Sequence, residues 1–142
     1  MLLPTEIGAN WYVHDLRTAS KRGKPPRFDN NNDGMTFEFD RVPDDELWLV
    51  TRVIATAHDG LPSDLAPPRF LKNLNAQANF IGVAVQAVAA TTVGYYLWEP
   101  PQPVHLPGGD NLLVRWVPWQ QSGQSTLNFT TTVQYTVLRR AS

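Results

Sequence analysis

Cysteine is absent from this chain of 142 residues, and its absence excludes several kinds of site. Without cysteine the protein has no disulfide scaffold, no thiolate nucleophile and no thiolate ligand for zinc. The fold must therefore be stabilised by a hydrophobic core, and a chain of this length can bury one within a single domain.

Long apolar runs are missing as well. No run approaches the roughly 18 residues of a membrane-spanning helix, and the start of the chain lacks the basic and apolar segments of a signal peptide. The 12 basic and 13 acidic residues leave a net charge of -1, which gives no general attraction for nucleic acid or anionic membranes. We expect a protein that folds in a cytoplasm, with neither nucleic acid nor membrane as a partner.

Catalytic motifs are missing too. The chain contains no G-x-S-x-G, no P-loop and no G-x-G-x-x-G. The histidines His14, His58 and His105 do not have the spacing of a zinc site. The acidic run Asp44-Asp45-Glu46 would need burial to become a general acid or base, and in a turn we expect it to be solvated. We therefore expect no enzyme activity.

Short alternating runs make up most of the rest of the chain. The clearest is Leu127 to Val137, in which apolar residues alternate with uncharged polar ones, as in a strand with one buried face. Leu47 to Val50 is apolar on both faces, which predicts a central strand covered on both sides. Further strands are expected at Trp11–Leu16, Met35–Asp40, Phe80–Val88, Val93–Trp98 and Leu112–Trp119.

These runs predict an all-β fold, an antiparallel β-sandwich or jelly roll of about seven to eight strands. We expect the last two strands to form a hairpin through the loop Gln120 to Ser125. Phe70, Leu71 and Leu74 have the spacing of one helical turn, and the proline-rich stretch Glu99 to Gly109 should be a stiff connection.

We expect one domain. Residues 28–142 should form the β-sandwich, and residues 1–27 an N-terminal arm and basic loop that includes the first strand. The segment Ala19 to Arg27 has little apolar content and should be a flexible loop or arm. It lacks the stacking aromatics of a single-strand nucleic-acid site, but it could contact an acidic neighbour. The basic residues that could make this contact are Lys21, Arg22, Lys24 and Arg27, together with Arg17, which precedes the segment.

Charge is nearly absent from the second half of the chain. From Asn73 to Leu138, a stretch of 66 residues, only Glu99, Asp110 and Arg115 are charged. Interspersed charges keep soluble proteins apart, so a surface without them suits contact with other protein. The alternative interpretation is that this half simply holds the core strands.

Asp29 to Gly34 matches the first half of a calcium-binding loop, in which Asp29, Asn31 and Asp33 would supply oxygen ligands. The twelfth position is Asp40, where a longer glutamate is usual, and the flanks do not resemble helices. A cluster of asparagine, aspartate and glycine between strands is first of all a turn. We favour the turn and expect no other cofactor.

Five tryptophans are many for this length. Trp98 and Trp119 lie at expected strand ends, where exposed rings could stack on sugars and make the chain a carbohydrate-binding module. The alternative, which we favour, is that large rings pack in the core or at interfaces.

Two stretches carry a family resemblance: Val104 to Trp116, with its Pro107-Gly108-Gly109-Asp110 turn, and Thr131 to Val137. They resemble the small β-sandwich structural proteins of tailed-bacteriophage particles, such as head decoration (cement) proteins and related head or tail accessory proteins. Pro107 and Gly108 suit the second and third positions of a type II turn.

The resemblance covers only the C-terminal part of the chain. It implies a homo-oligomer, often a trimer, that sits on a capsid lattice and binds the major capsid protein or another virion protein. It carries no catalytic residues. We therefore expect a virion structural protein, assembled in the host cytoplasm, with the carbohydrate-binding module as the alternative.

Overall fold

The computed structural model describes residues 10–23, 35–58, 66–74, 77–86, 94–116 and 128–141, which form strands and connections and no helix. These residues contain ten strands: β1 (Trp11–Gly23), β2 (Met35–Glu38), β3 (Glu46–His58), β4 (Arg69–Leu74), β5 (Gln77–Val83), β6 (Val85–Gln86), β7 (Tyr95–Trp98), β8 (Val104–Pro107), β9 (Asn111–Trp116) and β10 (Asn128–Arg140). The predicted all-β class is confirmed. The number of strands is higher than expected, partly because the short strands β6 and β8 count as separate elements.

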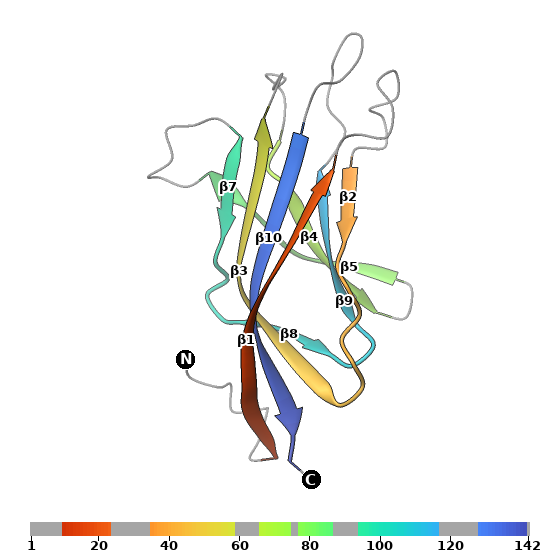
Figure 1. The fold of residues 1–142 in the computed structure, drawn as a ribbon. Coiled ribbons are helices and arrows are strands. Elements are labelled where there is room, and N and C mark those ends of the chain that lie inside the picture. The colour runs from red at the N-terminus through yellow and green to blue at the C-terminus, as the bar shows by residue number, and fades with distance from the viewer. Residues whose placement is uncertain are drawn as a thin grey trace.

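The strands form two antiparallel sheets, as expected for a β-sandwich (Figure 1). The larger sheet has six strands in the order β1-β10-β3-β7-β6, with β8 also paired to β3. The smaller sheet has the order β2-β9-β4-β5. Three strands of 13 residues each, β1, β10 and β3, form a long ribbon in the larger sheet.

Strand β3 is central, as its apolar run predicts. It pairs with β10 along one side and with β8 and β7 along the other. Trp48 and Val50 belong to the main core between the sheets, whereas Leu49 belongs to a separate small cluster. That cluster consists of Leu47, Leu49 and Leu138, with Trp11 packed against it. Both faces of this part of β3 are therefore covered.

Strand β10 confirms the alternation read from the sequence. Phe129, Thr131 and Val133 are buried, and Thr130 and Thr132 between them are partly exposed. Side chains alternate across a strand, so Phe129, Thr131 and Val133 face the core and Thr130 and Thr132 face the other way.

The predicted hairpin between the last two strands is wrong. β9 pairs with β2 and β4, whereas β10 pairs with β1 and β3. The two strands instead face each other across the core, where the rings of Trp116 and Phe129 lie 4.7 Å apart. Each strand has a buried face, and packing those faces together buries both at once.

The predicted helical turn is also wrong, because Phe70, Leu71 and Leu74 lie in strand β4. This strand has partners on both sides, β5 and β9, and Phe70 is fully buried. Three apolar residues cannot distinguish a helical turn from a strand, so the neighbouring strands decide. The expected strand at Phe80–Val88 is present over its described part as the end of β5 and then β6, with Ala84 between them.

The basic segment does not begin as a loop. β1 continues to Gly23 and pairs with β10 along its length, so Ala19 to Gly23 belong to the sheet. Residues 24–27 lie outside the described residues. The expectation of an arm fails here because β10 offers a full-length partner strand, which composition alone cannot reveal.

The Pro-Gly-Gly-Asp turn lies one residue later than expected. The N–H of Asp110 donates to the carbonyl of Pro107 at 3.0 Å, and Gly109 has φ of +89° at the third position, as a type II turn requires. The turn follows β8, which interrupts the expected stiff connection. Arg41 Nη1 also donates to the Gly109 carbonyl at 2.8 Å, which fixes the turn against the segment before β3.

Candidate functional site

The larger sheet has one face that points away from the core, here named the outer face. Because Val53, Ala55, Tyr96, Phe129 and Val133 point into the main core, their neighbours along β3, β7 and β10 point outward. The outer face comprises Thr18, Ser20, Arg22, Arg52, Ile54, Thr56, Tyr95, Leu97, Thr130, Thr132 and Gln134.

The strand register arranges these residues in rows. One row runs from Ser20 through Thr132 and Ile54 to Leu97, and crosses four strands. The hydroxyls of Ser20 and Thr132 lie 2.7 Å apart and satisfy each other. The middle of the outer face is therefore a flat array of hydroxyl, methyl and aliphatic groups.

Among the residues that the structure describes, the charged members of the outer face are Arg22 and Arg52. Arg22 is exposed on β1. Arg52 Nη2 lies 3.2 Å from Glu99 Oε2, so its charge is matched locally. The charge-poor half predicted from the sequence thus supplies much of one continuous face.

The first half of β1 exposes apolar side chains beside the outer face. Tyr12 is 48% exposed, Val13 52% and Leu16 72%. The β1–β10 register shifts between Val13 and Asp15, so His14 forms a bulge. The patch is not evident from the sequence alone, although two adjacent apolar residues within an otherwise alternating strand are a signal for such a bulge.

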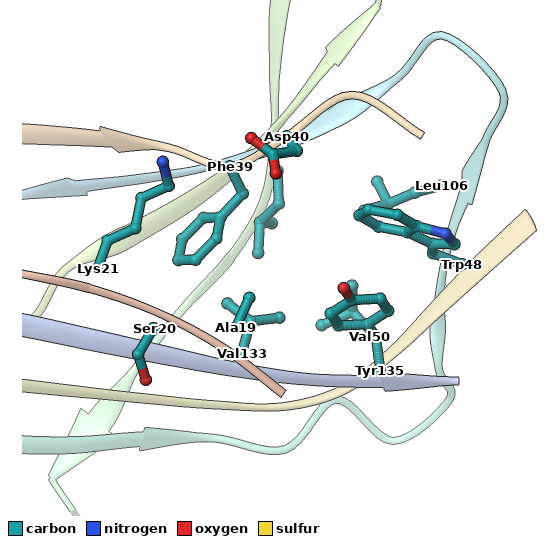
Figure 2. Close-up of a pocket in the computed structure, with 11 residues that line it drawn as sticks. Ala19, Ser20, Lys21, Phe39, Asp40, Trp48, Val50, Leu106, Val133 and Tyr135 are labelled. Carbon is teal, nitrogen blue, oxygen red and sulfur yellow. The ribbon is translucent and has the colours of Figure 1, made fainter. Parts of the chain in front are cut away.

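A cavity of about 280 Å³ lies between the sheets, beside the second half of β1 (Figure 2). Its lining is mainly apolar, and the rings of Trp48 and Tyr135 stack 4.4 Å apart in its wall. Lys21 and Asp40 also line it, with Lys21 Nζ 5.8 Å from the centre of the Phe39 ring. The volume falls just below the range of typical small-molecule sites.

Apolar side chains and one phenol make up most of the cavity wall. Burial raises the pKa of the Tyr135 phenol, against the opposing charge of Arg17, so the hydroxyl stays neutral near pH 7. The remaining wall consists largely of Phe39, Val50, Leu106, Leu112 and Val133. This part of the lining suits a small apolar group.

The acidic run divides into two environments. Asp44 and Asp45 are exposed, as expected, but Glu46 begins β3 and is only 4% exposed, which corrects the expectation for that residue. Trp48 Nε1 donates to Glu46 Oε1 at 2.9 Å, and Arg139 lies 3.1 Å from Oε2. Burial alone would raise the pKa of Glu46, but these two hydrogen bonds and the Arg139 charge hold it below its ordinary value. The carboxylate is thus a structural anchor and stays ionised.

We expect Glu46→Gln to lower the free energy of unfolding at pH 7 by about 1.5–3 kcal/mol, because it removes a charged acceptor opposite Arg139. Since the folded pKa of Glu46 is lowered, this stabilisation is present above the ordinary pKa of 4.5 and is lost as the pH falls through the folded value. Urea unfolding at several pH values measures this. A difference between the two proteins that persists at pH 2 would contradict it.

The predicted calcium ligands are only partly within the described residues. Asp29, Asn31 and Asp33 lie outside them, and Asp40 is an exposed residue that lines the cavity. The part of the chain that the structure describes contains no group of three histidine, aspartate or glutamate side chains able to hold a metal. The three histidines lie on β1, β3 and β8.

The predicted basic residues do not act as one cluster. Arg17 Nε forms an ion pair with Asp15 at 3.0 Å, Lys21 lies over Phe39, and Arg22 is exposed. Lys24 and Arg27 lie outside the described residues. Strand alternation separates Arg17 and Lys21 from Arg22, because residues at odd and even positions point to opposite faces.

Trp98 is a packing residue. Its ring stacks on Phe70 with centroids 4.5 Å apart and planes 7° apart. A methyl group added to Gly82 would lie 2.6 Å from the indole, so this glycine makes room for the ring. These contacts favour the packing interpretation over the sugar-binding one. Trp119 lies outside the described residues.

Comparisons with known proteins give the chain no family: no protein-family model matches it, and no curated protein matches its sequence. Within the described ranges, no helix is long and apolar enough to cross a membrane.

Proposed function

We propose that this protein is a structural building block that binds other protein through the outer face of the larger sheet. The observation that carries the proposal is the row Ser20-Thr132-Ile54-Leu97, which crosses four strands without a charge. Charged residues are depleted at the centres of protein interfaces because their desolvation is unfavourable. Threonine offers methyl groups to a partner, and its hydroxyl can form a hydrogen bond within the sheet, as that of Thr132 does with Ser20.

Two buried carboxylates also have structural surroundings. Glu46 and Asp110 are buried carboxylates with structural partners: Arg139 lies 3.1 Å from the first, and Lys72 lies 3.9 Å from the second. Burial raises the pKa of Asp110, and the charges of Lys72 and Arg41 oppose this shift. Neither carboxylate lines the cavity between the sheets. These contacts support a structural role for both carboxylates.

The particular assembly we propose is a virion. The C-terminal resemblance to decoration and cement proteins of tailed bacteriophages supports a homo-oligomer that decorates or cements a capsid, or acts as a head or tail accessory protein. Its partners would be other copies and the major capsid protein or another virion protein. The outer face is the surface we assign to the lattice.

The test is a charge placed at the centre of the outer face. We expect Thr132→Lys to remain folded, because Thr132 is partly exposed, and to reduce co-sedimentation with assembled capsids about tenfold or more. The matched control is Thr36→Lys, on an exposed position of β2 in the other sheet, which should bind normally. Equal binding by both variants, or no binding by the unmodified protein, would overturn the proposal.

A further inference from the structure

Strand β1 has a free edge. One side of the strand pairs with β10 from Trp11 to Gly23, and the other side pairs with no strand among the described residues. At 13 residues it is among the longest strands of the protein, and a long unpaired edge is a template for another strand.

Only the end of this edge is covered. Gly23 lies close to β2, since a methyl group added to it would lie 2.6 Å from Met35 Cε and 3.3 Å from the Phe37 ring. In Figure 1 the start of β1 runs beside β10 alone, at the end of the molecule away from β2. The open part of the edge therefore includes Tyr12, Val13 and Leu16, the exposed apolar residues of the strand.

The backbone of Leu16 points toward the free edge. Its N–H donates to Asp15 Oδ1 at 2.9 Å, so this donor is not used in the ladder with β10. Backbone groups alternate between the two sides of a strand. An added strand could therefore pair with Leu16 without removing any hydrogen bond to β10.

The charges favour one register for a second copy. When two copies of one strand pair about a two-fold axis normal to the sheet, the residue on the axis faces itself. An axis at Asp15 or at Arg17 places like charges opposite each other. An axis at Leu16 places each Asp15 opposite the partner's Arg17, and Leu16 opposite Leu16 of the partner subunit.

We propose that two copies of this chain pair antiparallel through β1, with Leu16 on the two-fold axis. Asp15 of each copy then exchanges its bond to its own Arg17 for one to the partner's Arg17, and releases the Leu16 N–H to the partner's backbone. The inference deepens the proposed assembly function and rests on it for its biological meaning. Because the axis is normal to the sheet, both outer faces lie side by side on the same side of one continuous sheet.

Two features restrict the contact to a reversible dimer. The Asp15 carboxylate covers the Leu16 N–H in the single copy, and the bulge at His14 interrupts the regular strand beyond it. Bulges and charges on edge strands limit edge-to-edge pairing. The resulting dimer differs from the trimer that the family resemblance implies, so the mass of the oligomer decides between them.

The experiment is a pair of charge variants of the full chain. Asp15→Arg alone and Arg17→Asp alone place like charges opposite each other in the dimer. Each variant should therefore raise the dissociation constant of the dimer about tenfold or more, measured at concentrations where the unmodified protein is dimeric. Mixed in equal amounts, the two variants have complementary strands and should form a heterodimer. Native mass spectrometry identifies it by its mass.

A second pair of variants tests the backbone contact. Leu16→Pro removes the edge N–H but no bond to β10, and should abolish the dimer, whereas Leu16→Ala keeps the N–H and should retain most of it. Circular dichroism confirms that both are folded. A monomer or trimer at all concentrations, or charge variants that fail to combine on mixing, would overturn the inference.

The outcomes separate the two proposals. If capsid binding is lost in Thr132→Lys while the unmodified protein is monomeric, the edge contact is wrong and the proposed function stands. If the heterodimer forms but Thr132→Lys binds capsids normally, the edge contact stands and the role of the outer face is wrong.

Discussion

Replacing Trp116 by alanine is expected to lower the free energy of unfolding by about 3–5 kcal/mol, the upper range for a large-to-small core substitution. Its side chain is fully buried, its ring lies 4.7 Å from Phe129 and 5.5 Å from Tyr96, and it therefore joins β9 to β10 and β7 across the core. Thermal unfolding followed by circular dichroism should show a melting temperature lower by roughly 10–15 °C.

The control for this substitution is Trp116→Phe. Phenylalanine fills most of the same volume and removes the indole N–H, which is buried and has no hydrogen-bond partner among the described residues. Removal of an unpartnered donor offsets part of the lost packing, so we expect a loss of about 1–2 kcal/mol. If alanine and phenylalanine destabilise the protein equally, Trp116 does not lie where the two sheets meet.

Replacing Leu49 by alanine should lower the free energy of unfolding by about 2–5 kcal/mol. Leu49 is fully buried in the small cluster with Leu47 and Leu138, on the opposite side of β3 from the main core. Trp11 packs against this cluster, so the cavity left by the substitution should also loosen the start of β1. Chemical denaturation measures the first effect, and hydrogen exchange along β1 measures the second.

Leu16→Ala is the matched control, because the same substitution is made at a leucine that is 72% exposed. At low protein concentration, where copies are apart, it should change the free energy of unfolding by less than about 0.5 kcal/mol. A similar loss at both positions would mean that Leu49 is not buried in a second cluster, or that Leu16 is covered.

The sequence predicts the strands best where burial alone decides the pattern. The alternation through Phe129, Thr131 and Val133 requires one buried face, and the run Leu47 to Val50 requires two. Both expectations hold because side-chain direction follows from local backbone geometry.

The turn from Pro107 to Asp110 has its left-handed glycine one residue later than the sequence suggests, because either of two adjacent glycines could take that position.

Pairing between strands was not predictable in the same way. The hairpin expected for β9 and β10 fails, because a strand pattern states which face is buried but not which strand lies beside it. The segment Ala19 to Gly23 failed for the same reason, since its partner in β10 is distant in sequence. Long-range register depends on the whole set of apolar faces rather than on any single segment.

In the candidate site, too, local composition was predictable from the sequence and the placement of strands was not. The low charge between Asn73 and Leu138 indicated a surface for protein contact, and much of the outer face comes from that region. The contribution of β1 was missed, because its position at the edge is a property of topology. The position of Trp98 at a strand end suggests an exposed ring, but Phe70 stacks on that ring, and only the fold brings these two residues together.

The position of β10 between β1 and β3 has a consequence for the order of folding. Neither β1 nor β3 pairs with the other, and each completes its ladder only with β10, the last of the ten strands to be synthesised. The entropy of closing these long loops is lost before their contacts can form, so the step should be slow. Among the described strands, β1 therefore has no partner until β10 has been synthesised and pairs between β1 and β3.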